Sequence, residues 1–231
     1  MAYLLEGFVK AWVLLLTGHP ETYSAVAVSL KTTALSTAGS LAAGIPAGFC
    51  LAYFTFPGKR FIRALVDTLL ALPTVVVGLL VYAFVTYRGP LGKFGLLFTI
   101  PGMAIAQVIL VIPIVVSLTA TAVESLDRRF RPTLLSLGAR GGQLLLATLA
   151  ESRFAVLTAA VTAFGRAISE VGASMMIGGN IKWHTRTITT AIALETGKGE
   201  FAMGVALGIV LLLLAFIVNW ALVYLRRRAQ W

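Results

Sequence analysis

The chain has 231 residues, of which 58% are hydrophobic and 12% are charged, and its formal net charge is +10. Soluble domains carry about 25% charged residues, so this composition excludes an ordinary soluble protein and indicates an integral membrane protein. The positive charge does not indicate nucleic-acid binding, because Lys and Arg gather at the ends of apolar runs, where membrane helices meet anionic lipid.

The first segment, residues 1–18, contains the short apolar stretch FVKAWVLLLTG, which includes Lys10. This stretch is too short to cross a bilayer comfortably, since a crossing helix needs about 20 apolar residues. It favours an amphipathic helix that lies at the membrane interface, with a tilted sixth crossing as the alternative. Residues 19–231 are expected to form one transmembrane domain, which includes the segment 124–150.

Five apolar runs follow, each long enough to cross a membrane at about 1.5 Å per residue. They cover residues 24–56, 62–87, 99–123, about 150–178 and 201–225. Small residues recur inside them and permit close packing of helices. The expected fold is therefore all-α and integral to the membrane, with about five transmembrane helices and one N-terminal interfacial helix.

The distribution of Lys and Arg between alternate loops predicts the orientation of the chain. The loops 57–63 and 124–153, together with the C-terminus, hold eleven cations, whereas the opposite loops hold five. Cytoplasmic loops are enriched in cations, so we expect the larger set and the C-terminus on the cytoplasmic side.

The segment 124–150 is predicted to form a short cytoplasmic helix, a turn and a second helix. Pro132 suits the first turn of a helix, and Gly138 can end that helix because glycine adopts the left-handed conformation at little cost. The segment is either an ordinary basic loop or a docking site for a soluble partner. The candidate coupling residues are Arg128, Arg129, Arg131, Leu137, Gly138, Ala139 and Arg140.

The end of the fourth apolar run is unusually polar. Arg166 and Glu170 lie four residues apart and hence on one helical face, and a charge inside a bilayer is costly unless it is paired or faces water. They are interpreted either as a local ion pair or as the lining of a translocation path. The candidate residues for this path or its outer mouth are Arg166, Glu170, Ser174, Asn180, Lys182, His184 and Arg186.

Three of these candidates, Lys182, His184 and Arg186, predict positive charge at the outer mouth. Such a field would favour a doubly charged anion. The alternative is an exposed loop that meets an acidic partner, and no proton-transfer role is assigned to His184.

Several motifs are missing from the sequence. It has no G-x-x-x-x-G-K-[ST] phosphate-binding loop, no His/Glu metal motif and no nucleophile–base arrangement, and its single cysteine, Cys50, excludes a cysteine-based metal site. The chain is expected to be non-catalytic, to hold no cofactor or metal, and to draw energy from another chain. The alternative, a gradient-driven secondary transporter, predicts intramembrane carboxylates, for which only Glu170 and Asp67 qualify.

Two stretches carry a resemblance to permease subunits of ATP-binding-cassette importers. Leu137-Gly138-Ala139 is similar to the glycine centre of that family's cytoplasmic signature loop, although Pro132-Thr133-Leu134 stands at its Glu-Ala-Ala positions. The run GRAISEVGASMMIGGNIKWHTRTITTAIALETGKGEFA resembles the permeases of oxyanion importers, closest to those for tungstate and next to those for molybdate. The resemblance extends over residues 24–225.

This resemblance implies a type I importer permease, multi-pass in the prokaryotic cell (inner) membrane, that works as a pair. It implies tungstate as the cargo, with molybdate or sulfate as the alternatives. The implied partners are a second copy of the chain, a cytoplasmic ATPase dimer that binds ATP and Mg, an external substrate-binding protein, and membrane lipid, with no nucleic acid. Segment 124–150 would then seat on the ATPase.

Overall fold

The structure, a computed structural model, describes residues 2–127 and 129–228. In these ranges every regular element is a helix, which confirms the predicted all-α class. The α-helices are α1 (Ala2–Leu16), α2 (Pro20–Tyr53), α3 (Lys59–Leu69), α4 (Thr74–Val85), α5 (Ile100–Glu124), α6 (Phe130–Ser136), α7 (Gly142–Glu151), α8 (Arg153–Ile168), α9 (Gly172–Gly178), α10 (Ile188–Gly197) and α11 (Phe201–Arg228). A 3-10 turn, Gly92–Phe94, follows α4.

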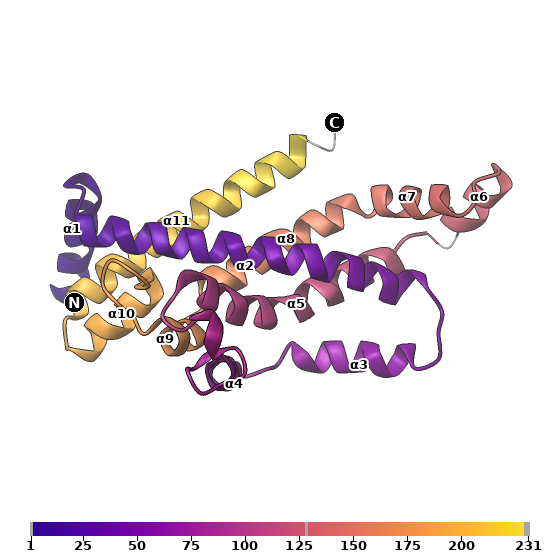
Figure 1. Ribbon diagram of the computed structural model, residues 1–231. Helices are drawn as coiled ribbons and strands as arrows, with labels where there is room; N and C mark the ends of the chain where they lie inside the picture. The colour runs from indigo at the N-terminus through magenta and orange to yellow at the C-terminus, as the bar shows by residue number, and fades with distance from the viewer. Residues whose placement is uncertain (1, 128, 229–231) are drawn as a thin grey trace.

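The centre of the bundle is the pair formed by α2 and α5, which pack along each other with α8 beside them (Figure 1). Glycine makes the close approach possible. A Cβ atom at Gly48 of α2 would lie 2.5 Å from the carbonyl oxygen of Val116 in α5, closer than atoms can pack. Small residues at such contacts let helix backbones approach inside a membrane, where packing rather than water exclusion drives association.

Among the described residues, three helical segments are long and apolar enough to cross a membrane, namely α2, α5 and residues 201–221 of α11. The number rises to five if each of two bent pairs, α3 with α4 and α7 with α8, counts as one span. The prediction of about five transmembrane helices agrees with this upper number.

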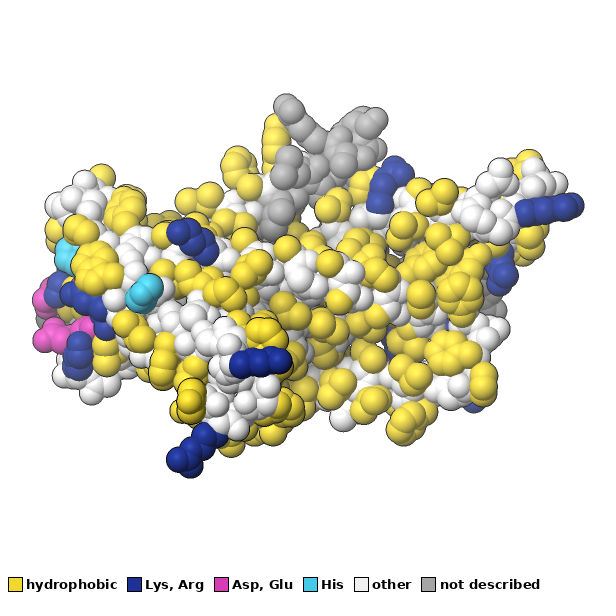
Figure 2. All heavy atoms as spheres, in the orientation of Figure 1, with side chains coloured by type: hydrophobic (Ala, Val, Ile, Leu, Met, Phe, Trp, Pro, Cys, Tyr) yellow, Lys and Arg dark blue, Asp and Glu magenta, His cyan; other side chains and the backbone are white. Residues whose placement is uncertain are grey.

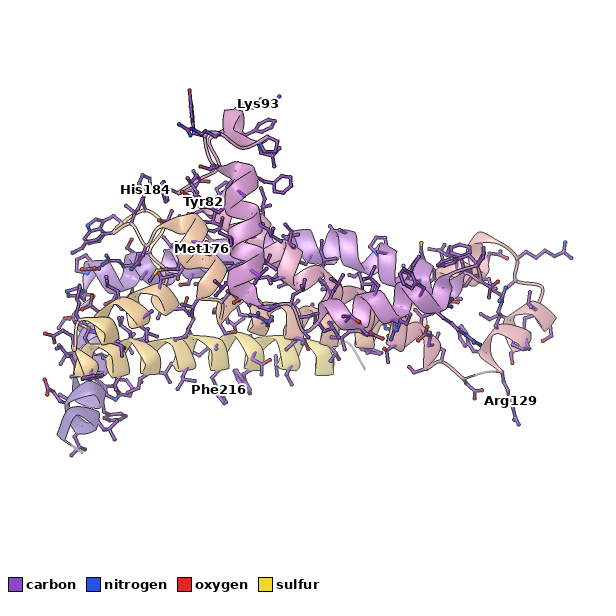
Figure 3. The ribbon with its side chains drawn as sticks, turned by 90° about the horizontal axis from the view of Figure 1, so that it is seen from below. Tyr82, Lys93, Arg129, Met176, His184 and Phe216 are labelled. Carbon is purple, nitrogen blue, oxygen red and sulfur yellow. The ribbon has the colours of Figure 1, made fainter. Side chains whose placement is uncertain are left out.

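The predicted single crossing over 62–87 is wrong in one respect, because the chain bends by 100° between α3 and α4. Pro73 precedes α4 with an extended backbone, and a residue before proline disfavours the helical conformation. As a result α4 stands across the bundle, with Lys93 beyond its end (Figure 3).

The predicted run 150–178 is also divided, into α8 and α9, with a break at residues 169–171. The helix α9 continues to Gly178, so Met176 is helical. The following helix, α10, was not among the predicted elements. Its start is fixed by Thr187, whose side chain accepts a hydrogen bond from the Thr190 backbone N–H in a capping box.

The helix α1 has 15 residues and packs against α11 through Ala11, Leu14 and Ala206. Its location at the membrane interface stays a prediction. Figure 1 places α1 and α10 at one end of the bundle, hereafter the α10 end, and α6 with the turn between α2 and α3 at the other, the α6 end. The acidic and histidine side chains visible in Figure 2 gather at the α10 end, and hydrophobic side chains cover most of the middle.

Candidate translocation path and coupling segment

The predicted ion pair is present at the break between α8 and α9. Arg166 Nη1 lies 2.7 Å from Glu170 Oε2, and the Glu170 side chain is only 3% exposed. The second carboxylate oxygen accepts a hydrogen bond from the backbone N–H of Ala173 at 3.0 Å, in the first turn of α9. Thr189 Oγ1 donates to the Glu170 carbonyl oxygen at 2.9 Å. The buried carboxylate therefore links the two helices at the break, because it pairs with Arg166 of α8 and accepts a hydrogen bond from the first turn of α9.

This pair lies near the middle of the bundle. Ala163 and Ala167, which lie on either side of Arg166 in α8, pack against Val111 and Val115 near the midpoint of α5. Because α5 is one of the helices long enough to cross a membrane, Arg166 lies far from both ends of a crossing. A charge at that depth requires pairing, water, or both.

A polar stripe runs along one face of α8 up to this pair. Its members, Thr158, Thr162, Arg166 and Ser169, recur at helical spacing. Thr162 and Ser169 are exposed, and the Arg166 side chain is 33% exposed, so the rest of the chain leaves this face uncovered. The three hydroxyls donate to carbonyl oxygens of their own helix.

The stripe leads into a crevice toward the α6 end of the bundle. This crevice has a volume of about 420 Å³ and lies between the last turns of α5 and the start of α8. Its polar lining includes Ser125, Glu151 and Thr158. A polar, uncovered face that continues into a crevice with some polar lining is suited to contact with water along a path through the bundle.

Ser174 does not face that path, because it belongs to a buried polar network. Gln107 Nε2 donates to Ser174 Oγ at 3.1 Å, and Ser36 Oγ donates to Gln107 Oε1 at 2.9 Å. All three residues are buried. The network joins α9, α5 and α2, so its role is to hold the short helix α9 against the central pair.

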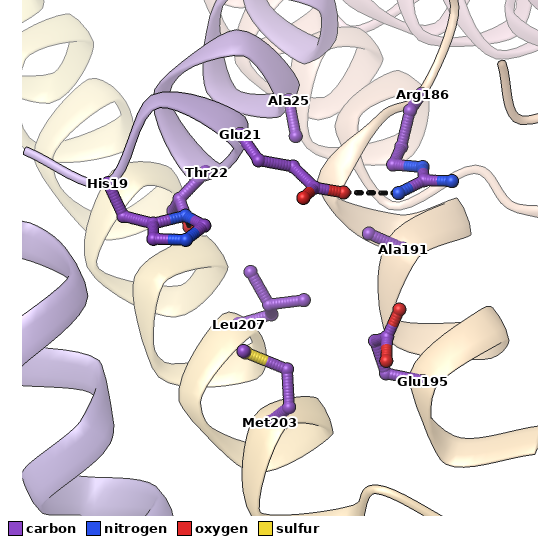
Figure 4. Close-up of a pocket in the computed structure, with 9 residues that line it drawn as sticks. All are labelled: His19, Glu21, Thr22, Ala25, Arg186, Ala191, Glu195, Met203 and Leu207. Atoms are coloured by element: carbon purple, nitrogen blue, oxygen red, sulfur yellow. Dashed lines mark hydrogen bonds and ion pairs between the residues drawn. The ribbon is translucent and has the colours of Figure 1, made fainter. Parts of the chain in front are cut away.

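The residues of the predicted positive outer mouth have an acidic partner that the sequence analysis did not include. Lys182 Nζ lies 2.6 Å from one carboxylate oxygen of Glu21, and Arg186 pairs with the other (Figure 4). Glu21 begins α2 and was missed, since nothing in its local sequence indicates contact with a loop 165 residues away. The single carboxylate offsets one of the two positive charges, so the three side chains keep a net charge of +1, and the field predicted for an incoming anion is reduced but stays positive.

The remaining loop candidates differ from each other. Asn180 adopts a positive φ of 50° and donates from its side chain to the Thr190 carbonyl oxygen at 3.4 Å, which ties the loop to α10. His184 is exposed on the same loop (Figure 3). Beside the loop lies a pocket of about 220 Å³ between the start of α2, α10 and α11, lined in part by His19, Glu21 and Glu195.

The coupling segment has the predicted helix, turn and second helix, α6 and α7, with its glycine in the expected place. Gly138 has φ +85°, the left-handed conformation. Its N–H donates to the Leu135 carbonyl oxygen and the Ala139 N–H to that of Leu134, both at 3.0 Å, which is the Schellman pattern. Leu137 beside them is 78% exposed.

The arginines of this segment hold no buried position where the structure describes them. Arg129, Arg131 and Arg140 are exposed, and Arg128 lies outside the described residues. The Arg131 guanidinium lies 5.6 Å from the ring centre of Tyr53, so a cation–π contact links α6 to the end of α2. Within the described part of the chain, no group of three His, Cys, Asp or Glu side chains could hold a metal ion.

The sequence of this chain is similar to a family of membrane transport proteins and to several named permeases. The family described as binding-protein-dependent transport system inner membrane component matches residues 44–231. The tungstate uptake system permease protein TupB of Campylobacter jejuni is 44% identical over 97% of this chain and 94% of that protein. TupB of Peptoclostridium acidaminophilum is 38% identical, over 97% and 98%. The molybdenum transport system permease protein ModB of Escherichia coli K12 is 32% identical, over 78% and 83%.

Two solved structures share the fold. One is the MetNI methionine ABC transporter in inward-facing conformations, with a TM-score of 0.72 and 17% identity over 90% of this chain and 95% of that chain. The other is a bacterial ABC transporter involved in the import of the acidic polysaccharide alginate, with a TM-score of 0.75 and 18% identity, over 95% and 83%. At this identity the likeness concerns the fold alone.

Proposed function

The chain belongs to the family of binding-protein-dependent transport system inner membrane components, and from that premise we propose that it is the permease subunit of an ATP-driven tungstate importer. Two relatives named as tungstate uptake permeases, which match 97% of the chain, support the cargo. Molybdate and sulfate are the alternatives, because permeases named for these oxyanions also match. As a permease the chain carries no catalysis of its own.

The observation that carries the coupling role is the exposed helix α6 at the end of the bundle. Leu135 of α6 and Leu137, which follows the helix, are both exposed beside the Gly138 turn. The described part of the chain does not cover these two apolar side chains. A short helix that ends in a hydrogen-bonded turn, exposes apolar side chains and is flanked by arginines is suited to insertion into a groove of a soluble partner. We assign this partner as a cytoplasmic ATPase dimer that binds ATP and Mg.

The orientation follows from the same end of the molecule. The cation-rich turn between α2 and α3 lies at the α6 end together with the coupling segment (Figure 1). Placing the α6 end in the cytoplasm satisfies the enrichment of cytoplasmic loops in Lys and Arg. The α10 end, with the loop 179–187, then faces the external substrate-binding protein.

A second copy of the chain is required to enclose a path. The polar stripe on α8 is uncovered in the single chain, and lipid is an unsuitable neighbour for Arg166. Beside the stripe, α8 and α11 form an apolar groove of about 370 Å³ whose lining includes Phe164, Ile168 and Phe216. We propose that two copies associate so that the stripes face a shared aqueous cavity.

The experiment is reconstitution of the chain with its cognate ATPase and external binding protein in proteoliposomes. Tungstate bound to the binding protein is expected to stimulate ATP hydrolysis and to be taken up only when ATP is present. Molybdate and sulfate serve as the comparison anions. Uptake that follows an imposed ion gradient without ATP would contradict the proposal in favour of a secondary transporter.

A further inference from the structure

We propose that Arg166 is the anion-contacting residue at the middle of the translocation path, and that Glu170 positions it. This inference rests on the proposed function, and it names the side chain and the chemistry that the cargo meets inside the membrane. The ligand class is a tetrahedral oxyanion with two negative charges. No other described cation lies on the uncovered face of α8.

The first step is the environment of the guanidinium. Arg166 lies at the depth where Ala163 and Ala167 pack on the midpoint of α5, and a third of its side chain is uncovered. A guanidinium exposed to hydrocarbon at that depth is strongly unfavourable. The uncovered part of Arg166 must therefore face water, a second copy of the chain, or an anion.

The second step is a count of hydrogen bonds. A guanidinium has five N–H donors in a planar fork, and a carboxylate can accept two of them side by side. Glu170 accepts only one of them, at Oε2, while its Oε1 accepts from the Ala173 N–H. Among the described residues Arg166 has no further acceptor, so most of its donors are left for water or for a tetrahedral oxyanion, which offers several oxygens.

The third step is the strength of the site. Glu170 lowers the net charge of the pair, and the hydroxyls of Thr162 and Ser169 already donate to their own helix. The anion thus meets one shared guanidinium per copy and few other donors. Such a site attracts the cargo into the membrane centre and still releases it, which a conduit requires and a tight binding site would prevent.

The test uses chemical rescue in a background that lacks the native cysteine. The chain has one cysteine, so C50S/R166C carries a single thiol at the proposed site. We expect ATP-dependent tungstate uptake by the reconstituted complex to fall about tenfold to a hundredfold, the value of a charge-assisted hydrogen bond. A methanethiosulfonate reagent that adds an ethylammonium group should restore much of the uptake, and one that adds an ethylsulfonate group should not.

Tungstate delivered by the binding protein should also slow the modification of that thiol. The C50S variant treated with the same reagents is the control, and its uptake should not change. Equal rescue by both reagents, or a thiol that does not react with either, would overturn the proposal, because the site would then be insensitive to charge or closed to water.

A purely structural role for the ion pair is tested separately with R166Q, E170Q and the double variant R166Q/E170Q. If Arg166 only neutralises Glu170, the double variant regains uptake, which would overturn the proposal. If Arg166 contacts the anion, the double variant stays as low as R166Q. Assembly with the ATPase and ATP hydrolysis stimulated by the binding protein are measured in each. Failure of the wild-type complex to take up tungstate would instead contradict the proposed function itself.

Discussion

Glu21, in the first turn of α2, pairs with Arg186, in the loop before α10, across 165 positions of sequence. Lys182 binds the other oxygen of the same carboxylate at 2.6 Å. One acidic side chain thus holds two cations and joins the loop 179–187 to the central helix α2. The positive charges of Lys182 and Arg186 therefore help to attach the loop to α2.

The first prediction concerns this attachment. E21Q removes the charge that holds both cations, so the loop should open more often and trypsin should cleave after Lys182 and Arg186 several-fold faster. E195Q is the matched control, since Glu195 pairs with Lys198 within three residues on α10 and does not hold the loop. Equal cleavage rates in the two variants would contradict the assigned role of Glu21.

The second prediction concerns the turn after α6. Gly138 has a left-handed backbone, which costs a β-branched residue about 1–2 kcal/mol, so G138V should distort the Schellman turn that presents Leu137. We expect ATP hydrolysis to become uncoupled from tungstate uptake, with the ratio of tungstate to ATP reduced. G142A is the control, because a Cβ there meets nothing within 4 Å and the backbone is helical. Coupled uptake by G138V would count against the docking role of α6.

The third prediction concerns the buried amide of Gln107. Q107L removes the donor to Ser174 and the acceptor from Ser36, and should destabilise the protein by about 1–2 kcal/mol, the upper range for polar contacts between membrane helices. S36A should cost less, since it removes one of the two contacts. A double-mutant cycle measured by unfolding in mixed micelles gives the coupling between them. Additive effects would mean that the network does not act as a unit.

The fourth prediction concerns the packing of α2 on α5. G48A places a methyl group 2.5 Å from the Val116 carbonyl oxygen, so the helices must separate, at a cost of about 1–3 kcal/mol. G208A of α11 is the control, because a Cβ there meets nothing within 4 Å. Thermal unfolding in detergent should show a clear fall in midpoint for G48A only, and equal midpoints would contradict the close contact.

Local spacing in the sequence predicted the features whose partners lie within one helical turn. The four-residue spacing of Arg166 and Glu170 brings the two side chains within reach even though α8 ends between them, and the glycine at 138 gives a helix end almost regardless of its surroundings. Apolar run length likewise predicted α2, α5 and α11, because the thickness of a bilayer sets the length of a crossing helix.

Features that depend on distant partners were not predictable in this way. The pairing of Glu21 with the loop 179–187 joins segments 165 positions apart in the sequence, and Ser174 is bonded to Gln107 from another helix. The bend between α3 and α4 did have a local signal in Pro73, but hydropathy averaged over a window does not register a proline break.

The central claim is that the segment from α6 to α7 lies in the cytosol and seats on an ATPase. The most direct measurement is the reaction of a membrane-impermeant thiol reagent with C50S/L137C, since Leu137 is the most exposed apolar residue of the turn. We predict no labelling in intact cells, labelling in inside-out vesicles stripped of the ATPase, and protection when the ATPase is restored. Labelling in intact cells would invert the assigned topology and contradict the account.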